Sequence, residues 1–204
     1  MAKPRLLIAS NNPGKAAEYR ELLGDIGWEL VTPRDVGLHL EVEESGRDYA
    51  ENAKIKAATF AKASGLVALA DDSGIEVDAL GGEPGPLSAR FGGEVISDGE
   101  RVALLLERLA GVPPEGRSAR FRCLIAVARP EGRVDLFEGR CEGRVAVEPR
   151  GESGFGYDPV FLLPDRGLTM AELPPNEKNA VSHRGRAARQ AKAFLEGLLR
   201  ECRA

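Results

Sequence analysis

One segment of the sequence constrains the fold more than any other. The apolar run Leu66-Val67-Ala68-Leu69-Ala70 predicts a buried strand, and it is followed at once by Asp71 and Asp72. Ser73-Gly74 then predicts a break before a second apolar stretch. Two adjacent carboxylates at the end of an inner strand are costly to leave unpaired, because like charges resist joint ionisation. We interpret the pair as a candidate site for a divalent cation; the alternative is an acidic turn that is open to solvent.

Length and composition set the class of protein. A chain of 204 residues with 43% hydrophobic residues is long enough to bury a sizeable core. We predict a single domain over residues 1–204, with two lobes. No apolar run reaches the length of a membrane span, and the first residues lack a signal-peptide core, so we expect no membrane partner.

Charge and cysteine content exclude several function classes. The net charge of −4 argues against a sequence-independent nucleic-acid binder, which needs a basic surface, but it still allows a small anionic ligand. His39 and His183 are the only histidines and no Cys-x-x-Cys pair is present, which argues against zinc chemistry. Cys123, Cys141 and Cys202 are too few and too scattered for a disulfide framework. A cytoplasmic location is therefore expected.

Strand-like and helix-like segments alternate along the first half of the chain. Strands are predicted over residues 5–9, 28–31, 66–70, 120–128 and 134–147, the last two joined by a hairpin turn at 130–132. Helices are predicted from Pro13, over 46–64, from the capping box of Ser97 and Glu100, and over 183–200. Strands that first alternate with helices and later pair as a hairpin predict an α/β fold, in which helices flank a mixed sheet.

The first predicted strand passes into the first predicted helix through a candidate phosphate-binding loop. The loop comprises Ser10, Asn11, Asn12, Pro13, Gly14 and Lys15. Amide groups at a helix N-terminus favour an anion, and a lysine adds a point charge. The spacing differs from that of a P-loop. The alternative is that Asn12 only caps the helix and that Lys15 lies in solvent.

A second acidic cluster, at residues 41–44, precedes the helix that carries Lys56. A Mg²⁺ site takes only one or two carboxylates, so one acid of this cluster and one of the aspartate pair are enough. Lys56 lies close to the apolar face of its helix and can point into a cleft, whereas Lys54 is expected to face water. The alternatives are that the acids only favour a helix N-terminus and that Lys56 is a surface lysine.

Two later segments combine an aromatic residue with hydrogen-bonding groups. In the loop Phe155-Gly156-Tyr157-Asp158, the phenyl ring can stack on a flat ligand and the carboxylate can accept from a ring N–H. The alternative is a core aromatic residue in a turn. Lys178, Ser182, His183 and Arg184 concentrate hydrogen-bond donors just before the last predicted helix, where they also suit a helix cap with a solvated basic edge.

Together these segments resemble the inosine triphosphate pyrophosphatase family, the Ham/RdgB-type nucleotide pyrophosphatases. Seven motifs follow the family's order through almost the whole chain. They are Ser-Asn-Asn-Pro-Gly-Lys at 10–15, Glu-Asn-Ala at 51–53 with Lys56, Ala-Asp-Asp-Ser-Gly at 70–74, Leu-Gly-Gly-Glu-Pro-Gly at 80–85, Ser-Ala-Arg at 88–90, Gly-Phe-Gly-Tyr-Asp-Pro at 154–159 and Ser-His-Arg-Gly at 182–185. Each motif alone is weak evidence for a family, but seven motifs in the same order are highly specific.

The resemblance implies Mg²⁺-dependent hydrolysis of ITP, dITP and XTP to the nucleoside monophosphate and pyrophosphate. It also implies an elongated two-lobed fold with a long mixed sheet and a central substrate cleft, usually in a homodimer. It assigns Asp72 as general base and metal-linked carboxylate and Glu44 as the other Mg²⁺ ligand. The implied substrate contacts are Ser10, Asn11, Asn12, Pro13, Gly14, Lys15, Lys56, Ser73, Phe155, Gly156, Tyr157, Asp158, Lys178, His183 and Arg184.

The residues and the family resemblance together imply a mechanism, in which the identity of the general base stays open. Asp72, or Asp71 beside it, takes the proton of a water that attacks the α-phosphorus, and coupled carboxylates titrate as a pair, so the choice stays open. Lys15 and Lys56 neutralise the negative charge that develops on the pyrophosphate leaving group during the reaction. Two other functions stay open: a Maf-like pyrophosphatase of modified or pyrimidine nucleotides, and a nucleotide-binding sensor without turnover.

Overall fold

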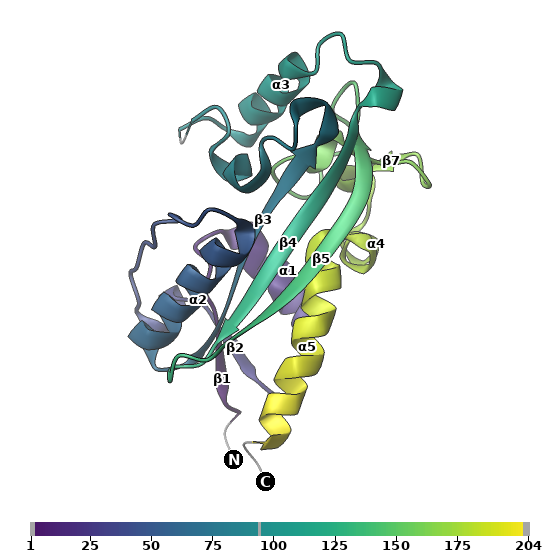
Figure 1. The fold of residues 1–204 in the computed structure, drawn as a ribbon. Helices are drawn as coiled ribbons and strands as arrows, with labels where there is room; N and C mark the ends of the chain where they lie inside the picture. The colour runs from purple at the N-terminus through teal and green to yellow at the C-terminus, as the bar shows by residue number, and fades with distance from the viewer. Residues whose placement is uncertain (1–2, 94, 202–204) are drawn as a thin grey trace. The chain divides into compact units, whose positions relative to one another are not determined.

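The computed structural model describes residues 3–93 and 95–201. Its described strands form one sheet in the order β2-β1-β3-β4-β5-β6-β7 (Figure 1). The strands are β1 (Arg5–Ile8), β2 (Glu29–Val31), β3 (Val67–Val77), β4 (Ser118–Ala128), β5 (Val134–Val145), β6 (Phe161–Leu163) and β7 (Leu168–Thr169). β1 pairs in parallel with β2 and β3, while β6 pairs antiparallel with β5 and β7. The predicted mixed sheet is confirmed.

Helices flank this sheet, as predicted for an α/β fold. The α-helices are α1 (Pro13–Leu23), α2 (Tyr49–Ser64), α3 (Asp98–Arg108), α4 (Pro175–Val181) and α5 (His183–Glu201). Short 3₁₀ turns lie at Arg34–Val36, Asp78–Leu80, Gly85–Arg90, Pro114–Gly116, Asp158–Val160 and Met170–Glu172. Within the ranges 3–93 and 95–201, no helix is both long and apolar enough to cross a membrane.

The chain divides into two compact units that interleave in the sequence. Unit 1 comprises Met1–Asp72, Cys123–Gly139 and Gly185–Ala204, and unit 2 comprises Ser73–Arg122 and Arg140–Arg184. The strands β3, β4 and β5 contribute residues to both units. The central cleft that the family resemblance implies stays a prediction.

Unit 1 has two cores, because successive strand side chains point to opposite faces of the sheet. One core packs α1 and α5 on the sheet through Leu6, Ile8, Tyr19, Leu69, Cys123, Ile125, Ala188 and Leu195. The other packs α2 on it through Leu7, Ala9, Ala53, Ala57, Phe60, Ala68, Ala70, Leu124 and Ala126. Figure 1 shows α2 and α5 on opposite faces of this part of the sheet. The strands are apolar on both faces because helices cover both.

The prediction that the central strand stops at the aspartates is wrong. β3 runs without interruption from Val67 to Val77, through Asp71, Asp72 and Gly74. Gly74 permits close contact here: a Cβ would overlap the carbonyl oxygen of Gly85 and the hydroxyl oxygen of Ser88. That hydroxyl accepts the Ile75 N–H at 2.9 Å. The glycine marks a close approach of two segments, which sequence patterning does not distinguish from a strand break.

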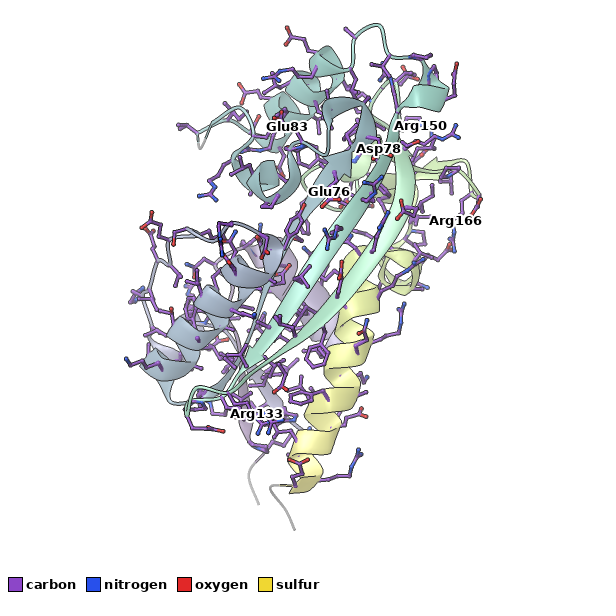
Figure 2. All side chains as sticks on the ribbon, viewed as in Figure 1. Glu76, Asp78, Glu83, Arg133, Arg150 and Arg166 are labelled. Carbon is purple, nitrogen blue, oxygen red and sulfur yellow. The ribbon has the colours of Figure 1, made fainter. Side chains whose placement is uncertain are left out.

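Unit 2 has a single core around the remaining parts of the long strands. It contains Ile75, Val77, Val102, Leu105, Phe121, Cys141, Tyr157, Phe161 and Met170. The predicted capping box is confirmed, since Ser97 and Glu100 each accept the other's backbone N–H at the start of α3. Glu76 of β3 pairs with Arg122 of β4 at 3.2 Å, and Asp78, in the 3₁₀ turn after β3, pairs with Arg120; Figure 2 labels Glu76 and Asp78.

Two helix boundaries differ from the predictions. α2 begins at Tyr49 instead of residue 46, because the carboxylate of Asp48 caps it by accepting the Glu51 N–H at 2.8 Å. The short helix α4, at residues 175–181, is one that the sequence patterns did not predict. Cys123 and Cys141 are buried and not joined in a disulfide, whereas Cys202 lies outside the described residues.

Candidate functional site

The adjacent aspartates of β3 have separate surroundings. Asp71 shares the alternation of Leu69, on the face covered by α1 and α5, and Asp72 shares that of Ala70, on the face covered by α2. Both side chains are buried, at 3% and 4% exposure. An acidic turn open to solvent is therefore excluded, and each carboxylate depends on partners from a different helix.

Asp71 is held by α1 and β4. Its Oδ2 lies 3.1 Å from the Lys15 Nζ, which is only slightly exposed. The same oxygen lies 3.7 Å from the Cys123 Sγ. A carboxylate that is paired with an ammonium group keeps its charge when it is buried. Lys15 is thus directed into unit 1, and the alternative that it lies in solvent is wrong.

Asp72 is held by two side chains of α2. The Asn52 Nδ2 donates to its Oδ2 at 3.0 Å, and the Lys56 Nζ lies 3.9 Å from its Oδ1. Burial raises the pKa of Asp72 above its ordinary value, and the attraction of Lys56 offsets only part of this effect. A buried carboxylate with a raised pKa is suited to accept a proton.

Glu44 completes the group in unit 1. Its Oε1 lies 2.5 Å from the Lys56 Nζ, so one ammonium group is shared by Glu44 and Asp72. Burial of Lys56 alone would lower its pKa, but the attraction of the surrounding carboxylates prevails and the pKa is raised. Lys54 is exposed, as predicted. The charged groups from α1, β3, the 41–44 segment and α2 therefore form one connected set in unit 1.

This donor set is compatible with Mg²⁺. Glu44 and Asp72 already share a cation through Lys56, so their carboxylates lie on either side of a position that accepts positive charge. Among residues 3–93 and 95–201, no group of three or more His, Cys, Asp and Glu side chains is arranged to hold a metal. Two carboxylates suffice for Mg²⁺, which completes its coordination with water and phosphate.

The predicted phosphate loop is ordered by its own polar side chains. Asn12 caps α1 by accepting the Lys15 N–H at 3.1 Å, so the capping role foreseen for it is confirmed. The Ser10 hydroxyl accepts the Asn12 N–H, and the Asn11 amide donates to the Leu40 carbonyl at 3.2 Å. The loop therefore presents a fixed helix N-terminus, beside which Lys15 supplies a positive charge.

In unit 2, the loop at Phe155 is built on a buried ion pair. The Lys178 Nζ lies 2.6 Å from the Asp158 Oδ2, and both residues are buried. The same oxygen accepts the Phe155 N–H at 2.9 Å, while the Gly156 N–H donates to Asp98. The Phe155 ring is partly exposed, with Lys178 5.0 Å from its centre. Lys178 and Asp158 thus fix the ring in place.

Arg184 is a second cation near this ring, and the other predicted residues of unit 2 have partners of their own. The Arg184 guanidinium lies 5.4 Å from the centre of the Phe155 ring and donates to the Ser73 hydroxyl at 2.8 Å. His183 stacks on Phe121, with 4.6 Å between the ring centres. Both residues lie in the first turn of α5, where the helix predicted over 183–200 begins. The Tyr157 hydroxyl is buried and donates to the Ser88 carbonyl, and burial raises its pKa.

Sequence reasoning missed three residues that hold these groups. Asn52 appeared only as a member of a motif, although it lies four residues before Lys56 and so on the same helix face. Cys123 is fully buried beside Asp71, and no sequence signal pointed to it. Asp98 begins α3 and accepts the Gly156 N–H at 2.8 Å, a contact between segments far apart in sequence.

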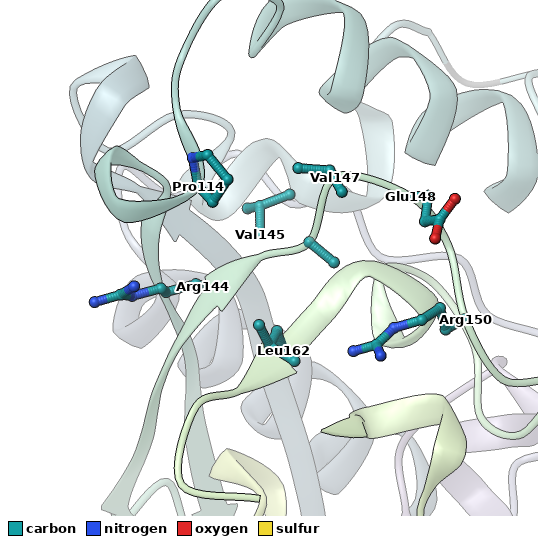
Figure 3. A pocket seen from close by; sticks show the side chains of 8 residues that line it. Pro114, Arg144, Val145, Val147, Glu148, Arg150 and Leu162 are labelled. Atoms are coloured by element: carbon teal, nitrogen blue, oxygen red, sulfur yellow. The ribbon is translucent and has the colours of Figure 1, made fainter. Parts of the chain in front are cut away.

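A separate pocket of about 250 Å³ lies elsewhere in unit 2 (Figure 3). It is lined by Pro114, Arg144, Val145, Ala146, Val147, Glu148, Arg150 and Leu162. None of the predicted site residues lines it. Its walls are largely apolar, and Glu148 is the acidic residue among them, so it differs in character from the carboxylate group of unit 1.

Comparison with known proteins gives consistent matches over nearly the whole chain. The model of the Ham1 family matches residues 6–194. A dITP/XTP pyrophosphatase of Desulforamulus reducens is 49% identical over 95% of this chain and 96% of its own, and one of Thermus thermophilus is 50% identical over 94% and 90%. The solved structure of a HAM1 protein from Coxiella burnetii superposes with a TM-score of 0.85 at 42% identity, covering 94% of this chain and 98% of its own.

Proposed function

Since the chain belongs to the Ham1 family, we propose that it hydrolyses non-standard purine nucleoside triphosphates, including ITP, dITP and XTP. The products are the nucleoside monophosphate and pyrophosphate. Two relatives at 49% and 50% identity carry the name dITP/XTP pyrophosphatase, and the matches extend over nearly the full length of both chains. In this role the enzyme removes deaminated purines from the nucleotide pool.

The observation that carries the proposal is the charged group of unit 1. Three carboxylates, of Glu44, Asp71 and Asp72, are interlinked with the ammonium groups of Lys15 and Lys56. A site that only bound phosphate would need the cations but not the buried carboxylates. Carboxylates that are buried at a cost in stability support chemistry on the phosphate, in addition to binding.

We propose Mg²⁺ as the metal, held by Glu44 and Asp72. When bound, it would offset charge on phosphate oxygens and make a water molecule more acidic. The shared ammonium contact of the two carboxylates supports this assignment. Lys56 would then remain beside them as a second positive charge, suited to hold a phosphate oxygen.

The other steps, proton transfer and stabilisation of the phosphates, are assigned to side chains of unit 1. Asp72, whose pKa burial raises, is the proposed general base, because it can accept the proton of the attacking water. Asp71 is the proposed support, since it holds Lys15 at the N-terminus of α1. Lys15 and Lys56 stabilise the negative charge that develops on the pyrophosphate leaving group. The loop of Ser10 to Gly14 positions the phosphates.

We assign the base to the group around Phe155. The ring offers a stacking surface, and the Arg184 guanidinium beside it offers N–H donors. We assign His183, which stacks on Phe121, as a further donor on the basis of the family resemblance. A 6-oxo purine presents an acceptor at O6, whereas adenine presents an amino group there and would leave a donor unpaired. A site built on hydrogen bonds rejects such an analogue far more strongly than apolar fit does.

A pyrophosphate-release assay with Mg²⁺ tests the proposal. We expect release from ITP, dITP and XTP to exceed that from ATP, GTP and dUTP by orders of magnitude. Preference for dUTP or a modified pyrimidine nucleotide would favour a Maf-like pyrophosphatase. Binding of ITP without release of pyrophosphate would favour a sensor. Either result would overturn the proposal.

We further propose a homodimer and a cytoplasmic location. The homodimer rests on the resemblance to the family, and the location rests on the low cysteine content. Light scattering coupled to size exclusion tests the first, and a mass of about twice 21.9 kDa is expected. Cell fractionation tests the second.

A further inference from the structure

The side chain of Asn52 joins two segments of unit 1 that carry the proposed metal ligands. Asn52 is 1% exposed and lies on α2. Its Nδ2 donates to the Asp72 Oδ2 at 3.0 Å, and its Oδ1 accepts the Gly46 N–H at 2.8 Å. One amide group therefore connects β3 with the segment that carries Glu44.

The backbone of Gly46 fixes which way this amide points. An N–H group can only donate, so the Asn52 atom that faces it must be the oxygen. The Asn52 Nδ2 then faces Asp72 as a donor, and it occupies the Oδ2 of that carboxylate. The other oxygen, Oδ1, is the one that lies nearest Lys56, at 3.9 Å. Asn52 thereby decides which oxygen of Asp72 is directed toward the cation.

Gly46 is packed against the same residue. A Cβ on Gly46 would lie 2.6 Å from the Asn52 Oδ1 and 2.8 Å from its backbone nitrogen, closer than side chains approach. Only glycine permits the 41–46 segment to pass this close to α2. Glu44 lies two residues before Gly46, and its Oε1 contacts Lys56. The segment is therefore anchored on α2 at two points, Glu44 and Gly46.

We propose that Asn52 is a positioning residue that sets the spacing of Glu44 and Asp72 for a divalent cation. The inference rests on the proposed function for the identity of the metal, but not for the geometry. Polar groups that orient metal ligands commonly change metal affinity or activity by about 10- to 100-fold when they are removed. Asn52 has the burial and both hydrogen bonds that such a role requires.

The test uses Mg²⁺ alone, without nucleotide. Binding to the folded state raises the melting temperature, so a Mg²⁺ titration of the melting temperature gives an apparent affinity. Asn52→Ala is expected to raise the half-maximal Mg²⁺ concentration by about 10- to 100-fold. If this variant melts at a lower temperature in EDTA but keeps the wild-type Mg²⁺ midpoint, Asn52 is merely structural and the inference fails.

A second variant and a control keep the test decisive. Gly46→Ala leaves Asn52 and every carboxylate in place but forces the two segments apart, so it should shift the Mg²⁺ midpoint in the same direction. Glu51→Gln, which changes the neighbouring residue that pairs with Arg47, should leave the midpoint unchanged. A wild-type melting temperature that does not respond to Mg²⁺ would overturn the inference.

The same preparations separate this inference from the proposed function. If the wild-type protein binds Mg²⁺ and Asn52→Ala weakens binding, but ITP yields no pyrophosphate, the proposed function fails and the role of Asn52 stands. If ITP is hydrolysed and Asn52→Ala retains the wild-type kcat and Mg²⁺ dependence, the positioning role fails and the function stands.

Discussion

Both units of the chain bury lysine–carboxylate pairs, but with a different balance of charge. In unit 1, three carboxylates, of Glu44, Asp71 and Asp72, are linked with two lysines. In unit 2, Lys178 and Asp158 balance each other, and Arg184 adds a further cation beside Phe155. The charged group of unit 1 therefore has an excess of carboxylates, whereas around Phe155 the two cations are matched by Asp158 and by Asp98 on the Gly156 N–H.

This difference explains what each group is suited to bind. Burial of the Asp72 carboxylate is costly, as its raised pKa shows; desolvation is the main cause and repulsion from Glu44 adds to it, so an added cation would reduce that cost. In unit 2 the ion pair is complete, so it holds the loop in place and leaves the ring and donors for an uncharged acceptor. The group in unit 1 is therefore suited to bind a cation, and the group around Phe155 is suited to recognise a ligand by its shape and its hydrogen bonds.

The largest expected effect concerns the unit 1 carboxylate that is proposed as general base. Asp72→Asn should fold normally but lower kcat for ITP by about 10³-fold, because the asparagine amide cannot accept the proton of water. Steady-state pyrophosphate release measures this. Asp165→Asn, in an exposed turn, is the matched control and should retain activity. An unchanged kcat would remove Asp72 from the mechanism.

Breaking the ion pair of unit 2 should act on stability instead. Asp158→Asn leaves the Lys178 charge buried without its carboxylate, so we expect a loss of about 3 kcal/mol in the free energy of unfolding. Urea denaturation measures the loss. The control is Glu177→Gln, which breaks an exposed pair with Arg166 and should cost less than about 1 kcal/mol. Equal losses in the two variants would contradict the structural role of Asp158.

Removing the aromatic ring of unit 2 should weaken binding without slowing chemistry. Phe155→Ala is expected to raise KM for ITP by about 10- to 100-fold, since stacking of a base on an aromatic ring contributes about 1–3 kcal/mol. kcat should change little, because the ring binds ground state and transition state alike. Val147→Ala, in the separate pocket, should leave both constants unchanged. A fall in kcat alone would argue against a base-binding role.

The smallest expected effect compares the two units directly. Burial raises the folded-state pKa of Asp72 above the ordinary value of 3.8, so stability falls as the pH rises from 3.8 through the folded pKa. Above that window the buried charge is a net cost. Asp72→Asn, measured in EDTA at pH 7, should therefore be about 1 kcal/mol more stable than wild type, while Asp158→Asn is less stable.

The pH dependence provides a check on this sign. The advantage of Asp72→Asn should shrink as the pH is lowered toward 3.8, because the wild-type carboxyl then takes up its proton. Thermal melts at a series of pH values measure it. If Asp72→Asn is less stable than wild type at pH 7, the buried charge of Asp72 stabilises the fold as that of Asp158 does, and the proposed difference between the two units is wrong.

Local patterns predicted most of the fold because short-range physics sets them. Pro13 begins α1, Ser97 and Glu100 form the predicted capping box, and the apolar runs form the strands of the sheet. The errors occurred where packing overrides pattern. Gly74 lies within a continuous strand because Ser88 and Gly85 approach it, and no local signal reports such an approach.

The sequence alone determined the order of strands and helices, the residue types of the candidate site and the resemblance to a family. Only the tertiary structure decided which partners each aspartate has. Because strand side chains alternate, Asp71 meets Lys15 on the α1 side, while Asp72 meets Asn52 and Lys56 on the α2 side. Their partners come from helices distant in sequence, so folding alone sets the burial and the ion-pair partners of each.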